Sequence, residues 1–203
     1  MRLYLVRHAR TNNNLFQLTQ GWTDTDLDEI GRQQAQAVAS YFETKEIGHI
    51  LSSDLQRAMH TAQPTAILKN LPIQPTELLR ERWLGELENA PMQKIRDAFE
   101  DEIERTGESR YKVRPQGVES AYDVMARIIE FARLIPIDEG DVAIFTHGMT
   151  KEVLLCHLIG CPVESSRSFC FDNASITSLR RDEDVWVIET YNDTRHLTHI
   201  ALT

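Results

Sequence analysis

The stretch Leu3-Tyr4-Leu5-Val6-Arg7-His8-Ala9-Arg10-Thr11 places an arginine and a histidine directly after four apolar residues. An apolar run of this length predicts a strand that is buried on both faces. Open α/β sheets bind their ligands beyond the carboxyl ends of their strands, which is where Arg7 and His8 would lie. Strands also end on polar residues simply because they leave the core there. The pair therefore indicates a functional site only if other residues support it.

The composition is that of an ordinary globular protein and predicts one domain over residues 1–203. Of the 203 residues, 41% are hydrophobic and 26% are charged. The formal net charge of −9 argues against nucleic acid and anionic membranes as partners, although a small anion could bind in a locally basic pocket. No apolar run is long enough to span a membrane, so we expect a cytoplasmic protein. The three cysteines lack a C-x-x-C spacing, and we assign them no chemistry.

Strand-like and helix-like segments alternate along the chain. Apolar residues at helical spacing predict helices over residues 28–45, 91–105, 118–132 and 150–159, and a further helix that is capped by Asp54 and bends or breaks near Pro64. Apolar runs predict strands over residues 47–51, 73–79, 141–146, 176–179 and 185–191. This alternation predicts an α/β fold, a three-layer α/β/α sandwich around a mostly parallel central sheet. We expect residues 85–116 to form a helical covering segment with little contact to the core.

Polar residues also follow three other predicted strands. Arg57 lies about one helical turn after the second strand, Glu81 shortly follows the third, and His147 follows the fourth. If these strands are parallel neighbours, their carboxyl ends meet in one crevice. We therefore expect two histidines, two arginines and a carboxylate to lie close together.

Such a group of side chains suits the transfer of a phosphoryl group. Two buried guanidinium groups need an anionic partner, and their forked geometry fits phosphate or carboxylate oxygens. Positive charge beside an imidazole favours the neutral form, which is a competent nucleophile. One histidine could attack phosphorus while the other histidine and the arginines stabilise the equatorial oxygens. The carboxylate could then protonate the leaving alkoxide.

Several short motifs follow one another along nearly the whole chain. They are Leu5-Val6-Arg7-His8-Ala9-Arg10-Thr11, Gln20-Gly21-Trp22, Asp26-Leu27 with Gly31, Ser52-Ser53-Asp54-Leu55-x-Arg57-Ala58-x-x-Thr61-Ala62, Leu79-Arg80-Glu81 with Gly85 and Glu88, Gly117-x-Glu119-Ser120, Thr146-His147-Gly148 and Asn173. Together and in this order they resemble the histidine phosphatase superfamily, the phosphoglycerate mutase-like proteins. The resemblance implies a phosphoglycerate mutase-like fold and a small phosphorylated substrate as the partner.

The resemblance also implies a role for each candidate residue. His8 corresponds to the histidine that becomes phosphorylated, and Glu81 corresponds to the proton donor. The phosphate pocket would comprise Arg7, Arg57 and His147. The positions that line the substrate site match Asn14, Gln20, Gly21 and Gly148.

No convincing set of metal ligands is visible in the sequence. His196 and His199 are spaced like a metal-binding pair, but they fall in a predicted tail and are more typical of structural or solvated residues. We therefore expect neither a metal ion nor another cofactor.

Three residues depart from the usual pattern of the family. Ala9 and Asn89 occupy positions that are usually glycine, and Arg10 replaces a glutamate that is common in glycolytic mutases. If Ala9 needed a positive φ, its backbone would be strained. None of the three departures removes a charged catalytic candidate.

The leading hypothesis is a metal-independent phosphomonoesterase that forms a phosphohistidine on His8 and passes the phosphoryl group to water. The first alternative is a mutase, which returns the phosphate to a second hydroxyl. Mutases of this family tend to carry a longer shielding insertion than the region between Glu81 and Ser120 provides. The second alternative is an inactive binding domain of the same fold, against which the intact charged candidates argue.

The sequence leaves the leaving group and the oligomeric state open. Three basic residues in an irregular segment, Arg110, Lys112 and Arg114, could meet a second anionic group of the substrate or simply be solvated.

Overall fold

A six-stranded sheet forms the centre of the computed structural model, which describes residues 1–137 and 139–200. The strand order is β3-β2-β4-β1-β5-β6. The four parallel strands are β1 (Arg2–Arg7), β2 (His49–Ser53), β3 (Ile73–Thr76) and β4 (Val142–Thr146). The antiparallel strands β5 (Ile176–Asp182) and β6 (Val185–Asp193) complete one edge. The mostly parallel sheet confirms the predicted α/β class.

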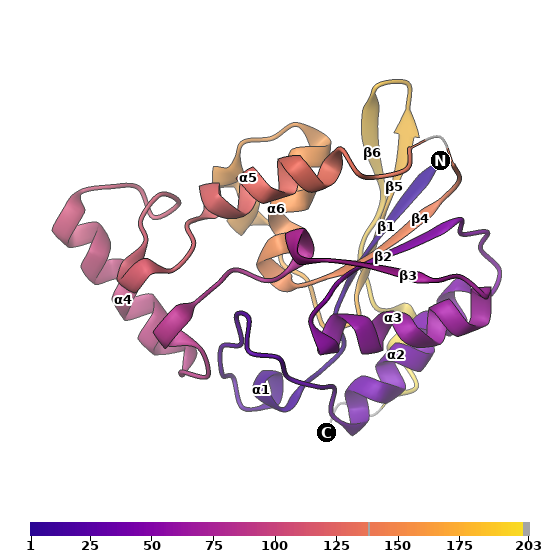
Figure 1. Cartoon of the computed structure of the whole chain (residues 1–203), viewed down its shortest axis with the longest axis horizontal. Helices are drawn as coiled ribbons and strands as arrows, with labels where there is room; N and C mark the ends of the chain where they lie inside the picture. Colours follow the sequence, from indigo (N-terminus) through magenta and orange to yellow (C-terminus); the bar gives the residue numbers. More distant parts are fainter. Residues whose placement is uncertain (138, 201–203) are drawn as a thin grey trace.

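Helices cover both faces of the sheet, as Figure 1 shows. On one face, Leu3 and Leu5 of β1 pack with α5 (Ala121–Ala132) and α6 (Gly148–Ile159). On the other face, Tyr4 and Val6 pack with residues of α2 (Glu29–Phe42) and α3 (Gln56–Lys69). Because alternate side chains of a strand point to opposite faces, burial on both faces requires an uninterrupted apolar run. The three-layer sandwich is therefore the predicted one.

Two predicted details around the second and third strands are wrong. The third strand ends at Thr76 and is followed by a 3₁₀ turn, η1 (Glu77–Leu79), rather than continuing to residue 79. Asp54 does not cap α3, because its carboxylate binds the guanidinium of Arg80 instead, at 2.8 Å from Nε. The first amide of α3, on Gln56, donates to the carboxylate of Asp24 at 2.7 Å.

The helix α3 also continues through its proline. Pro64 lies inside α3, which ends only at Lys69 and is followed by Asn70 in the left-handed conformation. The buried face of the helix, which includes Ala58, Ala62 and Ala66, packs on both sides of the proline. Packing of this face against the core compensates for the hydrogen bond that proline cannot donate.

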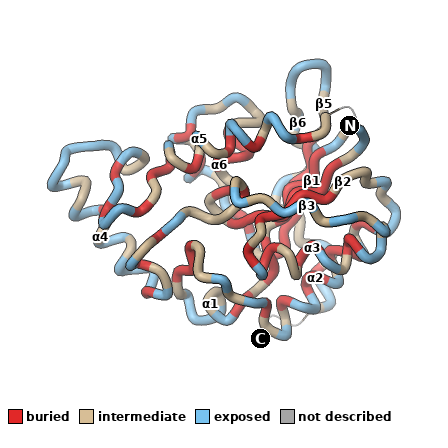
Figure 2. Tube along the Cα trace, in the orientation of Figure 1, coloured by how far each residue is buried: buried red, intermediate tan, exposed pale blue. Residues whose placement is uncertain are grey.

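The segment over residues 85–116 projects from the end of the sandwich. It contains η2 (Gly85–Leu87), α4 (Met92–Thr106) and the start of η3 (Pro115–Gly117). Figure 1 shows α4 well away from the sheet, and Figure 2 shows that most of it is exposed. Its one buried residue, Phe99, belongs to a small separate core whose other buried members are Leu84, Leu87, Val113 and Val118. The segment, which we call the covering segment, thus has a small core of its own and makes little contact with the main core.

Three short elements complete the described chain. These are α1 (Asn12–Leu15), η4 (Val163–Ser168) and η5 (Arg195–Leu197). The loop after α1 is tied to the covering segment, because the amide of Thr19 donates to the carbonyl of Ala90 at 2.9 Å. Among residues 1–137 and 139–200, no helix is long and apolar enough to cross a membrane.

A close contact at the start of α2 fixes the backbone that follows β1. The carbonyl of Arg10 accepts from the amide of Asp28 at 3.1 Å, and a Cβ atom on Gly31 would lie 2.0 Å from that carbonyl oxygen. We therefore expect Gly31→Ala to lower the free energy of unfolding by roughly 1–3 kcal/mol, as overpacking does, although alanine favours helices over glycine by about 1 kcal/mol. Urea unfolding would measure this.

The exposed Gln33 on the same helix provides a matched control. Gln33→Ala should change the free energy of unfolding by no more than about 0.5 kcal/mol. Unchanged or increased stability of Gly31→Ala would show that the contact with Arg10 does not constrain the chain.

Candidate active site

The carboxyl ends of β1, β4 and β2 lie side by side and bring the two histidines together. Arg7 pairs with Thr146 across the parallel β1 and β4 strands, so the next residues, His8 and His147, leave the sheet at the same edge. The centroids of their rings are 5.2 Å apart. Ser53, at the end of β2, completes this row.

The ring of His8 is held in one tautomer. It is 3% exposed, and its Nδ1 lies 2.8 Å from the carbonyl oxygen of Ala9. Because a carbonyl can only accept, Nδ1 carries the hydrogen. Burial, together with the charges of Arg57 and Arg7, holds the pKa of His8 well below its usual value. The imidazole is therefore neutral, and its Nε2 keeps a free electron pair.

Arg57 is fully buried and donates in three directions. Its Nη2 and Nη1 bind the carbonyl oxygens of Gly21 and Thr23 at 2.7 and 2.8 Å. Its Nε donates to Nδ1 of His147 at 3.1 Å. Burial lowers the pKa of Arg57 to about 10, which still leaves the guanidinium charged at neutral pH.

His147 has the opposite tautomer to His8. Since its Nδ1 accepts from Arg57, the hydrogen is on Nε2, which lies 2.8 Å from Oγ of Ser53 and donates to it. Burial and the charge of Arg57 hold the pKa of His147 well below its usual value. Both ring nitrogens of His147 therefore have protein partners, and the ring touches His8 without lining the cavity in front of it.

Arg7 also lines this cavity. Its Nη1 donates to the carbonyl of Phe171, whereas its Nε is buried with no hydrogen-bond partner among the described residues. A Cβ atom on Gly148 would lie 3.6 Å from this Nε and 3.6 Å from Oε2 of Glu81. An unpartnered buried donor is costly, and it suits a site for an anion.

Glu81 is held at the amino end of α6. Its Oε2 accepts from the amide of Met149 and its Oε1 from the amide of Thr150, both at 3.3 Å. Oε1 also accepts from the amide of Arg82 at 2.9 Å. Backbone donors at a helix start fix a carboxylate in position. The carboxyl group is thus oriented by three main-chain amides and by the hydroxyl of Thr150.

These side chains surround a cavity of about 300 Å³. The predicted site residues among its lining are Arg7, His8, Asn14, Gln20, Gly21, Arg57 and Glu81. Of the remaining two, Gly148 lies just behind Arg7 and Glu81, and His147 lies behind His8. The structure therefore brings all nine candidates to one end of the sheet.

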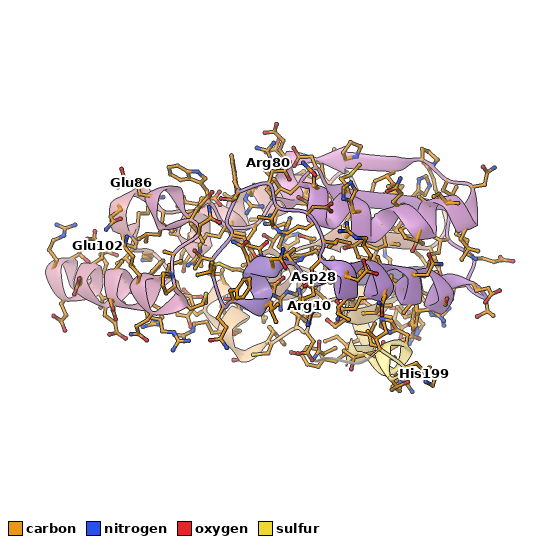
Figure 3. All side chains as sticks on the ribbon, turned by 90° about the horizontal axis from the view of Figure 1, so that it is seen from below. Arg10, Asp28, Arg80, Glu86, Glu102 and His199 are labelled. Atoms are coloured by element: carbon orange, nitrogen blue, oxygen red, sulfur yellow. The ribbon has the colours of Figure 1, made fainter. Side chains whose placement is uncertain are left out.

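The residues that depart from the family pattern fit the backbone. Ala9 is buried without a positive φ, and its amide donates to Oγ1 of Thr61 at 2.9 Å. Asn89 has a φ of +57°, a conformation that asparagine tolerates better than most residues. Arg10 forms an ion pair with Asp28 at 2.8 Å, and both lie near the start of α2 in Figure 3. The strain considered for Ala9 is absent.

Two charged residues of the cavity were missed by the sequence reasoning. Arg82 and Glu152 line it together with the predicted residues. Arg82 directly follows Glu81, and Glu152 lies four residues after Gly148, on the same face of α6. That helical spacing from Gly148 was a usable signal for Glu152. Among residues 1–137 and 139–200, no group of three histidines, cysteines or acidic residues is arranged to hold a metal ion.

The arrangement is suited to nucleophilic attack on phosphorus. A neutral His8 has a free Nε2, two guanidinium groups can stabilise the charge on phosphoryl oxygens, and Glu81 can exchange a proton with the leaving group. His147 holds Arg57 in place.

The tautomers and protonation states of the two histidines can be measured by ¹⁵N NMR of the ligand-free protein. We expect His8 to carry its hydrogen on Nδ1, His147 on Nε2, and neither ring to titrate between pH 7.5 and about 5.5, because the pKa of each is lowered on folding. The free energy of unfolding should consequently fall as the pH drops below about 6.5, the usual histidine pKa.

The urea-unfolded chain is the control, since there both rings should titrate near pH 6.5. A protonated His8 at pH 6.5 in the folded protein would contradict the proposed neutral nucleophile.

Comparison with known proteins identifies one protein family. The sequence model of the histidine phosphatase superfamily (branch 1) matches residues 3–194. A curated relative from Yersinia pestis (strain Pestoides F), named "Probable phosphoglycerate mutase GpmB", is 32% identical over 100% of this chain and 97% of its own.

Two similar solved structures are named as phosphatases. One is a mycobacterial glucosyl-3-phosphoglycerate phosphatase solved with VO3, with a TM-score of 0.82 and 29% identity, covering 95% of this chain and 99% of its own. The other is the α-ribazole phosphatase of Shigella flexneri, with a TM-score of 0.84 and 25% identity, covering 95% of this chain and 96% of its own. With the match over residues 3–194 and the shared fold, the chain belongs to the histidine phosphatase superfamily, branch 1.

Proposed function

We propose that the protein is a phosphomonoesterase that hydrolyses a small phosphorylated metabolite through a phosphohistidine on His8. The observation that carries this proposal is the state of His8 itself. Its Nδ1–H is bound to the carbonyl of Ala9, so its Nε2 is the unprotonated nitrogen, and His8 lines a cavity together with Arg7, Arg57 and Glu81. An imidazole held in this way is ready to act as a nucleophile.

The reaction follows from the positions of these groups. Nε2 of His8 attacks phosphorus and forms an N–P bond, while the ester P–O bond breaks. Arg7 and Arg57 stabilise the charge on the equatorial oxygens, so the protein supplies positive charge without a metal ion. Glu81 gives its proton to the departing alkoxide. A water molecule then attacks the phosphohistidine, Glu81 takes a proton from that water, and inorganic phosphate leaves.

The covering segment favours water as the final acceptor. A mutase must shield its phosphoenzyme, because water at its bulk concentration otherwise intercepts it. Here α4 adds one buried residue, Phe99, to the small core of the covering segment, and most of α4 is exposed. The phosphatase names of the two solved structures support the same choice.

A phosphotransferase is the second candidate, because the curated relative from Yersinia pestis is named as a mutase. Labelled 3-phosphoglycerate with a bisphosphate primer separates the two reactions. We expect inorganic phosphate to form faster than 2-phosphoglycerate, since α4 is mostly exposed and adds little cover over the site. Faster formation of 2-phosphoglycerate would favour the mutase.

The roles of His8 and Glu81 can be tested separately. His8→Ala removes the nucleophile, so activity should fall to background with every substrate. Glu81→Gln keeps the nucleophile but removes the proton donor, which should cost roughly 10²–10⁴-fold with an alkyl phosphate and much less with p-nitrophenyl phosphate, whose leaving group needs no proton. Single-turnover assays on both esters would measure this, and the Glu81→Gln variant should accumulate an acid-labile phosphoenzyme from p-nitrophenyl phosphate.

Retained activity in His8→Ala would exclude the proposed intermediate. Equal losses on alkyl and p-nitrophenyl esters in Glu81→Gln would exclude Glu81 as the proton donor. The exposed Glu86, five residues further along the chain, provides a control: Glu86→Gln should match the parent protein on both esters.

A further inference from the structure

A second, larger cavity adjoins the catalytic one. It has a volume of about 600 Å³, and we call it the outer chamber. The two cavities share five lining residues, namely Arg82, Met92, Ile95, Met149 and Glu152. A leaving group attached to a phosphate beside His8 would therefore extend into the outer chamber. Walls come from α4, the irregular segment that follows it, α6 and η4.

Arginines dominate the charged residues of the outer chamber. Four guanidinium groups line it, those of Arg82, Arg96, Arg110 and Arg167, against the two carboxylates of Glu100 and Glu152. Within the part of the chain that the structure describes, none of the four arginines takes part in an ion pair. This local positive charge contrasts with the formal net charge of −9 of the whole chain.

Arg82 provides the strongest local evidence. Its Nε is buried without a hydrogen-bond partner, and its guanidinium carbon lies 5.0 Å from the centroid of the Phe99 ring. Burial lowers the pKa of Arg82 to about 10, so the group is still charged at neutral pH. A half-buried cation beside an aromatic ring, with one buried donor unpaired, is well suited to bind an anionic oxygen.

The nearby carboxylate of Glu152 offsets little of this charge. It faces Arg7, Arg82, Arg167 and Glu81, and neither a hydrogen bond nor an ion pair joins it to them in the described chain. Burial and the charge of Glu81 raise the pKa of Glu152 to about 8, so that its carboxyl is largely protonated at pH 7.

The side chains of the three basic residues that follow α4 have different surroundings. Arg110 lines the outer chamber. Arg114 is instead paired with the carboxylate of Asp123, at 2.6 Å from Nε, and Lys112 is exposed near the ring of Tyr122. Only Arg110 of the three therefore lines the space where a leaving group would lie.

We propose that the outer chamber binds a second anionic group, a carboxylate or a phosphate, on the leaving group of the substrate. This rests on the phosphomonoesterase function proposed above and narrows its substrates to phosphate esters of acidic metabolites. Arg82 and Arg110 bind the second anion, Arg96 and Arg167 add positive charge at the exposed rim, and Phe99, Tyr111 and Met92 contact the carbon skeleton.

Matched pairs of substrates test this proposal. 3-Phosphoglycerate and glycerol 3-phosphate differ only in a carboxylate, and fructose 1,6-bisphosphate and fructose 6-phosphate differ in a second phosphate. For at least one pair, we expect kcat/KM to be roughly 10- to 100-fold higher for the ester with the second anion, as a charge-assisted hydrogen bond provides. The pair with the larger ratio identifies the anion as a carboxylate or a phosphate.

Substitutions of arginines in the outer chamber test whether these residues cause this substrate preference. In the double variant Arg82→Gln, Arg110→Gln, which removes both guanidinium groups proposed to bind the second anion, the ratio within the preferred pair should fall at least tenfold toward one. Arg114→Gln is the matched control, because Arg114 lies four residues from Arg110 but is paired outside the chamber, and its ratio should equal that of the parent. The ratio is independent of any general loss of active protein, and thermal unfolding of each variant would confirm that it folds.

The possible failures are distinguishable. Ratios near one for both pairs, or a ratio that survives the double variant, would overturn the second-anion site while phosphate release continues. No phosphate release from any ester, including p-nitrophenyl phosphate, would instead overturn the phosphomonoesterase itself.

Discussion

Positive charge held away from water is the constraint on which the site depends. Arg57 is fully buried, and a buried charge is costly unless polar groups surround it. Hydrogen bonds to backbone carbonyl oxygens offset much of this cost. Gly21 and Thr23 accept from Arg57, and Phe171 accepts from Arg7. These carbonyls come from loops that are distant in the sequence. Holding the two arginines therefore also fixes the loops that form the walls of the cavity.

The same charge determines what the two histidines can do. Each imidazole lies in a buried, positively charged environment, which favours the neutral ring and lowers its pKa. The hydrogen-bond partners then decide which nitrogen is free. The carbonyl of Ala9 leaves Nε2 of His8 unprotonated, whereas Arg57 and Ser53 use both nitrogens of His147. The two histidines thus differ in state: His8 has a free Nε2, as the proposed nucleophile requires, whereas both nitrogens of His147 are hydrogen-bonded.

The parts predicted correctly from the sequence are those set by local pattern. The apolar runs of β1 and β4 are buried on both faces, so they identified the strands and placed His8 and His147 at their ends. Asp54 was misjudged because its partner, Arg80, comes from another part of the chain, and because Asp24 binds the start of α3 instead. Local propensity cannot report competition between residues that meet only after folding.

The proposed catalytic groups and the proposed leaving-group contacts belong to different parts of the fold, and hydrogen bonds join the covering segment to the loop that holds Arg57. The proposed catalytic groups lie at the ends of β1 and β4, in the first turn of α3 and just after η1, whereas most of the outer chamber belongs to the covering segment and η4. Glu88 joins the two, because its carboxylate accepts from the amide of Trp22 at 2.8 Å and from the hydroxyl of Thr23 at 2.6 Å. The carbonyl of that same Thr23 accepts from Arg57.

This contact limits how the covering segment can move. A Cβ atom on Gly21 would lie 2.5 Å from the Glu88 carboxylate, so the loop that carries Gly21 and Thr23 is packed directly against it. Displacing Glu88 would shift two of the carbonyl oxygens that surround the Arg57 guanidinium. Residues of α4 and η4 have no such link in the described chain. The proposed substrate contacts of α4 and η4 can therefore change while the buried charge of Arg57, which lowers the pKa of His8, stays in place.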